Sequence, residues 1–173
     1  YSLMIGRRLH LSKKELKDLE LSAIFHDLGK IGIPDHVLLK PGRLDPDEFL
    51  IMKTHPEKSA RIVSSILEYQ DLIPIILHHH ERYDGKGYPH GLKGEEIPIG
   101  ARIILLADTF DAMTSSRAYR NALSRDIAIK EIEDCKGTQF DPEIADAFLE
   151  CLHHGEDLKI IPFLNYTNQK KAA

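Results

Sequence analysis

The chain has 173 residues, of which 42% are hydrophobic and 29% are charged, and this is the balance of one soluble globular domain with its own core. A formal net charge of −4 argues against a sequence-independent nucleic-acid binder, because such a protein needs a basic face to neutralise phosphates. No apolar run approaches the ~20 residues of a membrane span.

The N-terminal part of the chain has helical patterns. Apolar residues recur at helical spacing between residues 3 and 9, so the chain begins inside a helix, and we expect it to be a fragment of a longer protein. Ser12 followed by Glu15 forms a capping box, which predicts a helix that runs to about Leu28.

A second helix start lies at residues 45–48, which combine a capping aspartate, a first-turn proline and two further acids. This pattern predicts a helix that runs to about Tyr69 and bends near Pro56. Segments rich in glycine and proline at 31–44 and 83–98 predict irregular loops, where we expect the chemistry to be concentrated.

The C-terminal half is also helical. Helices are expected from Ile99 to Thr114, from about Ser124, and after the capping sequence at 141–143. No stretch alternates polar and apolar residues as a strand would, so we predict an all-α helical bundle with an irregular Gly/Pro loop at its active site. The two cysteines have neither disulfide nor zinc-knuckle spacing, which favours inert thiols in a reducing cytoplasm.

Several polar side chains lie at the ends of apolar segments, where helix packing does not require them. His26 and Asp27 end an apolar helix, and an ionised aspartate is costly to bury unless a cation or several donors compensate. Taken alone, this pair is better explained as a local hydrogen-bonded pair, and His55 taken alone would be a surface residue. Three consecutive histidines at 78–80 follow an apolar run. They indicate either a bound ligand or surface residues at the end of a helix.

A third group of polar side chains is a pair of aspartates on the most apolar helix. Asp108 and Asp111 are three residues apart and therefore share one face of that helix. Buried charges are paired or bind metals. A structural salt bridge to Arg102 or Arg117 is therefore the alternative to a metal site.

Six of these side chains form a set of nitrogen and oxygen ligands without sulfur, namely His26, Asp27, His55, His79, His80 and Asp108. Such a set suits Fe, Mn, Zn, Co or Ni. Six ligands exceed the need of one tetrahedral ion, and a carboxylate can bridge two. Two metals roughly 3.5–4 Å apart are the standard device for phosphoester hydrolysis.

Five motifs resemble those of the HD-GYP family. They are HDLGK (26–30), HPEKSA (55–60), HHERYDGKGYP (79–89), ADTFDAMTSSRAYR (107–120) and GTQFDPEI (137–144). The resemblance covers about Tyr1 to Leu149, and it places a domain at 1–164 and a polar tail at 165–173. It implies a helical, metal-dependent phosphodiesterase that hydrolyses the bacterial second messenger cyclic di-GMP. Such a domain is expected in the cytoplasm, as the output domain behind an N-terminal receiver or sensor domain.

The resemblance also implies roles for individual residues. His26, Asp27 and Asp108 would hold one metal, and Asp27 would bridge to a second metal held by three histidines, His55, His79 and His80. Asp27 and Lys30 are the expected catalytic residues. The residues expected to contact the substrate are Lys30, Tyr88, Asp111, Arg117 and Arg120, and those expected to support the site from behind are Glu81 and Asp84. His78 and the pair His153-His154 receive no role.

Two departures from the family pattern stand out. Ser59 occupies a position where family members usually have glycine, and this small residue is expected to cost little. The first metal-binding histidine of the family lies upstream of Tyr1, so we expect an incomplete first metal site in this chain. We therefore predict that it binds at most one metal tightly and hydrolyses cyclic di-GMP poorly or not at all. The alternative functions are an impaired module that binds cyclic di-GMP or a partner protein, and a hydrolase of another phosphoester.

Overall fold

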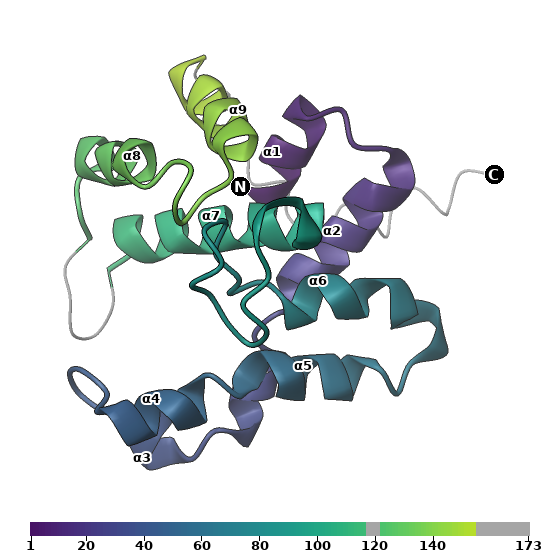
Figure 1. Ribbon diagram of the computed structural model, residues 1–173, viewed down its shortest axis with the longest axis vertical. Helices are drawn as coiled ribbons and strands as arrows, with labels where there is room; N and C mark the ends of the chain where they lie inside the picture. Colours follow the sequence, from purple (N-terminus) through teal and green to yellow (C-terminus); the bar gives the residue numbers. More distant parts are fainter. Residues whose placement is uncertain (117–121, 155–173) are drawn as a thin grey trace, which may run out of the picture.

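The computed structural model describes residues 1–116 and 122–154, and within them it is helical (Figure 1). The prediction of an all-α fold is confirmed, since the described residues contain no strand beyond one isolated bridge between Lys136 and Phe140. No helix among the described residues is long and apolar enough to cross a membrane. The helices are α1 (Ser2–Arg8), α2 (Lys13–Phe25), α3 (Asp35–Leu38), α4 (Pro46–Met52), α5 (His55–Val63), α6 (Ile73–Leu77), α7 (Ile99–Thr114), α8 (Arg125–Asp134) and α9 (Pro142–His153). Three short 3-10 helices accompany them, η1 (Leu28–Gly32), η2 (Leu67–Leu72) and η3 (Gly94–Glu96).

Helix α7 is the centre of the bundle. It contacts α1, α2, α6, α8 and α9, and Figure 1 shows these helices arranged around it. Its buried side chains form the main core together with apolar residues of α8 and α9. The rings of Tyr1, Phe110 and Phe148 pack against one another edge to face. The centroid of Tyr1 lies 5.2 Å from that of Phe110 and 5.8 Å from that of Phe148, and the two phenylalanine centroids are 4.8 Å apart. Because α7 is buried along most of its length, its polar residues are placed rigidly.

The predicted helix starts are confirmed in the structure. Ser12 and Glu15 form a complete capping box, and the Asp45 side chain accepts a hydrogen bond from the Glu48 N–H. Asp141 caps α9 in the same way, and the bounds of α7 agree with the prediction. These features agree because a cap is a contact between residues three apart, which the local sequence specifies.

The first predicted helix ends earlier than expected. We predicted an end near Leu28, whereas α2 ends at Phe25 and the chain turns at Asp27 into η1. The turn brings Gly29 against the backbone of α5, where a Cβ atom would lie 2.2 Å from the His55 carbonyl oxygen and 2.5 Å from the Ser59 nitrogen. A continued helix would carry Gly29 away from α5, so tertiary packing overrides the helical pattern here.

The single helix predicted from Pro46 to about Tyr69 is wrong. The structure divides it into α4, α5 and η2, with the first break at residues 53–54, just before the expected bend. Pro56 has no N–H to donate to the Met52 carbonyl oxygen, so a continuous helix would lose that hydrogen bond. The His55 side chain takes its place, and Nδ1 donates to the Met52 oxygen at 2.8 Å.

Candidate metal centre

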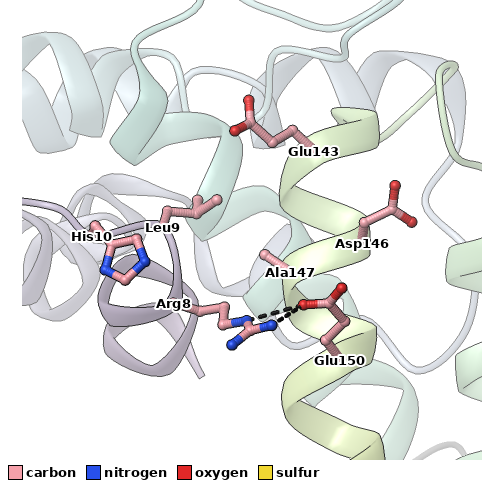
Figure 2. Close-up of a pocket in the computed structure, with 7 residues that line it drawn as sticks. All are labelled: Arg8, Leu9, His10, Glu143, Asp146, Ala147 and Glu150. Atoms are coloured by element: carbon pink, nitrogen blue, oxygen red, sulfur yellow. Dashed lines mark hydrogen bonds and ion pairs between the residues drawn. The ribbon is translucent and has the colours of Figure 1, made fainter.

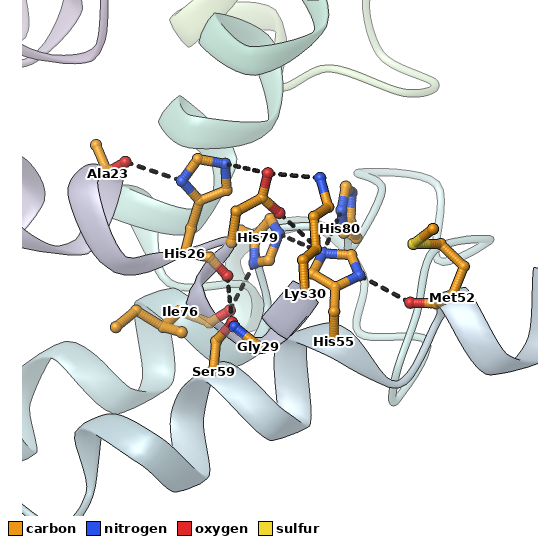
Figure 3. A network of polar contacts seen from close by, with 11 residues as sticks. Ala23, His26, Gly29, Lys30, Met52, His55, Ser59, Ile76, His79 and His80 are labelled. Atoms are coloured by element: carbon orange, nitrogen blue, oxygen red, sulfur yellow. Dashed lines mark hydrogen bonds and ion pairs between the residues drawn. The ribbon is translucent and has the colours of Figure 1, made fainter. Parts of the chain in front are cut away.

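Three histidines share one local arrangement, which Figure 3 shows from close by. Each stands at or just after the end of a helix and donates through Nδ1 to the carbonyl oxygen three residues earlier. His26 donates to Ala23 at 2.8 Å, His55 to Met52 at 2.8 Å and His79 to Ile76 at 2.6 Å. The last carbonyls of a helix lack partners within it, so each ring satisfies a main-chain group and is oriented by it. The three helices concerned are α2, α4 and α6.

These hydrogen bonds determine which ring nitrogen carries the proton. A carbonyl oxygen can only accept, so Nδ1 carries a proton in each ring, and Nε2 is the atom that a metal ion would bind. The Nε2 atoms of His55 and His79 are 3.3 Å apart, and the Nε2 atom of His80 lies 3.1 Å from that of His55. The centre thus gathers electron pairs from α5 and from the end of α6.

Asp27 supplies the negative charge of the centre. Its Oδ1 lies 3.2 Å from the His55 Nε2 atom, and its Oδ2 accepts from the Lys30 ammonium at 2.5 Å. The Nε2 atom of His26 is 3.5 Å from the same Oδ2. Burial alone would raise the pKa of Asp27, but hydrogen bonds from His55 and Lys30 and the charge of His26 outweigh it and hold the pKa well below its usual range. Asp27 therefore stays ionised.

The residues present fit a divalent metal. Asp27, His55, His79 and His80 each offer one ligand atom, and these atoms all lie within 4.8 Å of one another. Burial lowers the pKa of His80 to about 3, and burial and the charge of His80 lower that of His79, so both rings are neutral at pH 7. The Nε2 atoms of His55 and His79 face one another at 3.3 Å, and a divalent cation could bind both of them at once.

His26 adds to this fit. Its Nε2 atom is buried and has no hydrogen-bond partner among the described residues, although its ring lies 4.9 Å from that of His79. An unpaired buried acceptor costs about 1–3 kcal/mol, which a bound cation would remove. His26 therefore lies beside the four-residue group with its buried Nε2 atom unpaired in the described part of the chain.

Ser59, which departs from the family pattern, makes two hydrogen bonds within the fold. Its hydroxyl accepts from the Gly29 N–H at 2.7 Å and donates to the His26 carbonyl oxygen at 2.6 Å. The side chain is fully buried. Because it joins α5 to both sides of Asp27, Ser59 helps hold the turn that carries the carboxylate.

The aspartates of α7 are placed differently from the histidines. Asp108 is half-buried and does not belong to the four-residue group, but its charge and that of Asp27 raise the pKa of Tyr88, after the larger effect of burial. Asp111 is exposed. The alternative of a salt bridge to Arg102 is wrong, because that guanidinium pairs with Asp141 at the start of α9.

The glycine-rich loop covers one side of the centre. Tyr88 stacks on His80 with 4.8 Å between the ring centroids and 27° between the planes, and its amide donates to the His80 carbonyl oxygen at 3.3 Å. Gly87 lets the loop pass close to the backbone, since a Cβ atom there would lie 2.3 Å from the Arg82 nitrogen. Lys53 lies 5.3 Å from the centroid of the Tyr88 ring, on the side of α4.

The two supporting acids act on the loop and not on the four-residue group. Glu81 is fully buried, and its Oε1 accepts from the N–H groups of His90 and Gly91 at 2.7 and 3.1 Å. Asp84 pairs with Arg82 at 3.0 and 2.8 Å, and this guanidinium lowers the pKa of Asp84 to about 2. The sequence reasoning missed His90, which lies near His78; an additional histidine directly after GYP was the available signal.

The remaining expectations lie elsewhere or outside the described residues. Arg117, Arg120 and the tail at 165–173 lie outside them. His153 and His154 are exposed at the end of α9, away from any cluster of possible ligands found among the described residues.

A separate open pocket lies between α1 and α9 (Figure 2), and it contains none of the predicted site residues. Its lining is Arg8, Leu9, His10, Glu143, Asp146, Ala147 and Glu150.

The sequence of this chain is similar to those of known proteins. Residues 1–144 match the family model of the HD domain. The cyclic di-GMP phosphodiesterase response regulator RpfG of Xanthomonas campestris pv. campestris is 46% identical over 148 residues, which are 84% of this chain and 39% of that protein. A cyclic di-GMP phosphodiesterase of Thermotoga maritima is 46% identical over 150 residues, which are 84% of this chain and 40% of that protein. The chain thus spans about two fifths of the length of these relatives.

Solved structures show the same fold. The crystal structure of a cyclic GMP-AMP-specific phosphodiesterase of V. cholerae superposes with a TM-score of 0.71 at 22% identity, over 90% of this chain and 42% of that one. An HD domain implies a divalent-metal site, and the four-residue group can provide it. With its HDLGK and HHERYDGKGYP motifs, this chain belongs to the HD domain family and is of the HD-GYP type.

Proposed function

We propose that this chain is the catalytic domain of a metal-dependent phosphodiesterase that hydrolyses cyclic di-GMP. The observation that carries the proposal is the set of imidazoles whose Nδ1 atoms are held by the main chain and whose Nε2 atoms lie around the ionised Asp27. The names of two relatives that are 46% identical support the choice of substrate. A cytoplasmic output domain behind a receiver domain is part of the proposal, in keeping with the response-regulator name of one relative.

The ligand roles follow the sequence expectation. His55, His79, His80 and Asp27 would hold one divalent ion, and Asp27 would bridge to a second one shared with His26 and Asp108. The ions expected for such nitrogen and oxygen ligands are Fe, Mn, Zn, Co or Ni. A bound divalent metal supplies Lewis acidity toward a phosphoryl oxygen and toward the attacking water.

The chain's own residues bind and orient the substrate. Lys30 is a point charge next to Asp27, and its half-exposed ammonium can turn to a phosphate oxygen. Burial and the charges of Asp27 and Asp108 raise the pKa of Tyr88, so its phenol stays protonated and can donate a hydrogen bond. The ring of Tyr88 stacks on His80, and the ring of Phe49 meets it edge to face with 6.4 Å between the centroids, so these two rings are the aromatic surface that a guanine base would contact. Asp111, Arg117 and Arg120 are the further proposed substrate contacts.

The test is hydrolysis of cyclic di-GMP by metal-free protein after separate addition of Mn²⁺, Fe²⁺, Zn²⁺, Co²⁺ and Ni²⁺, with the products separated by chromatography. We expect weak metal-dependent turnover by this chain, which Asp27→Asn abolishes and His154→Ala preserves. Tight binding of cyclic di-GMP without turnover by any metal form would favour the impaired binding module. Measuring a chain extended upstream in the same assay shows whether an upstream histidine is needed.

A further inference from the structure

A second group of possible metal ligands lies at the end of α6 and in the loop that follows it. His78, Glu81 and His90 each offer a ligand atom, and the three atoms lie within 4.8 Å of one another. This group shares no residue with Asp27, His55, His79 and His80. None of its members has a role as a metal ligand in the proposed phosphodiesterase function.

His78 is oriented in the same manner as the histidines of the candidate metal centre. Its Nδ1 donates to the Pro74 carbonyl oxygen at 2.8 Å, so its Nε2 carries a lone pair. The Nδ1 atom of His90 lies 3.1 Å from that Nε2, with the two ring planes tilted by 52°. Two nitrogens bound tetrahedrally to zinc lie about 3.3 Å apart, given zinc–nitrogen bonds of about 2.0–2.1 Å. The observed separation is therefore close to that of two ligands of one ion.

Glu81 is the observation that favours a metal over a hydrogen bond between two neutral histidines. Its side chain is fully buried, and Oε1 is occupied by the N–H groups of His90 and Gly91. Oε2 is buried without a hydrogen-bond partner, and no ion pair of Glu81 occurs within residues 1–116 and 122–154. A hydrogen bond between the two histidines would leave this oxygen unpaired, which is costly for a buried carboxylate.

We propose that His78, Glu81 and His90 form a second divalent-metal site, distinct from the candidate metal centre. Two imidazole nitrogens and one carboxylate suit a borderline ion such as Zn²⁺, and three protein ligands leave one tetrahedral position for water. The ion would join the end of α6 to the segment that follows Tyr88 and Pro89. Its occupancy would therefore stiffen the loop over the candidate metal centre. The proposal does not require the chain to be a phosphodiesterase.

Zinc stoichiometry of the whole chain tests the proposal. Metal-free protein is equilibrated with buffered Zn²⁺, and bound zinc is measured by elemental analysis for the wild type and for His90→Ala, Glu81→Gln, His55→Ala and His154→Ala. His90 is exposed, so its substitution should leave the fold intact, which circular dichroism verifies. His154, exposed at the end of α9, is the matched control.

We expect His90→Ala to bind one zinc fewer than the wild type and His154→Ala to bind the same number. The affinity of that zinc should fall at least ~10-fold in Glu81→Gln, since losing even a group that supports a ligand costs about that much. His55→Ala should retain this zinc, and His55→Ala/His90→Ala should lose it. A Co²⁺-loaded protein gives a second readout, because the His90 substitution should remove one component of the visible absorption. Equal zinc content in folded wild type and His90→Ala would overturn the proposal.

Discussion

The core around α7 and the candidate metal centre are both buried, but they are built by different rules. In the core, Phe110 and Phe148 make non-directional contacts with many apolar neighbours, so their volume decides stability. In the centre, His55 and His79 are each held by one main-chain oxygen, and the direction of a lone pair decides what can bind. The comparison teaches that the core determines whether the chain folds, whereas the centre determines what the folded chain can hold.

The largest effect is expected from Asp27→Asn. The substitution keeps the shape of the side chain but removes the charge that faces His55 and Lys30. We expect loss of all measurable metal-dependent hydrolysis and of at least one bound metal, measured by product chromatography and elemental analysis. His154→Ala should change neither quantity. If both variants lost metal equally, the assignment of Asp27 as a ligand would be wrong.

Phe148→Ala should lower the stability of the fold and leave metal binding unchanged, which is the opposite of the effect of Asp27→Asn. Removing a fully buried phenylalanine from the main core should lower the free energy of unfolding by about 3–5 kcal/mol, measured by urea denaturation. The fraction that remains folded at low temperature should bind metal with wild-type affinity, because Phe148 belongs to the main core and none of the four clustered ligands does. A loss of affinity in the folded fraction would show that the two regions are not independent.

Ser59→Ala should affect both the stability of the fold and the binding of metal. The substitution leaves the Gly29 N–H and the His26 carbonyl oxygen without their partner in a buried place. We expect a loss of about 1–3 kcal/mol in the free energy of unfolding, together with weaker metal binding, because the turn that carries Asp27 loses its tie to α5. Ser59→Gly, the usual family residue, serves for comparison. No change in either measurement in Ser59→Ala would show that the hydroxyl is dispensable.

A further prediction concerns how the stability of the metal-free protein depends on pH. Burial lowers the pKa of His80 to about 3, whereas an unfolded histidine has a pKa of about 6.5. Between these values the unfolded state binds a proton that the folded state does not, so the free energy of unfolding falls as the pH is lowered. Each such group contributes up to about 1.4 kcal/mol per pH unit.

Urea denaturation of the metal-free protein at several pH values between 6.5 and 4 measures this slope. His80→Ala should flatten it, and His154→Ala should leave it unchanged. An unchanged slope in His80→Ala would mean that its ring is protonated in the folded protein.

Local sequence determined the parts of this protein that depend on neighbours a few residues apart. The caps at Ser12, Asp45 and Asp141 and the bounds of α7 were predictable, because a cap and an apolar stripe are contacts along one helix. The candidate ligands could also be named from sequence, since ionisable side chains at the ends of apolar segments need a partner. Their resemblance to HD-GYP motifs then implied which of them act together.

Only the tertiary structure decided where helices stop and which side chains meet. The helix predicted to Leu28 ends at Phe25 because Gly29 packs against the backbone of α5, a contact between segments about 30 residues apart. The same packing gives Ser59 its two hydrogen bonds. Asp108, on α7, lies outside the four-residue group. His78 and His90 are twelve residues apart, and the fold of the loop brings their nitrogens to 3.1 Å. Such distances depend on packing between segments, which no periodicity or cap along the chain encodes.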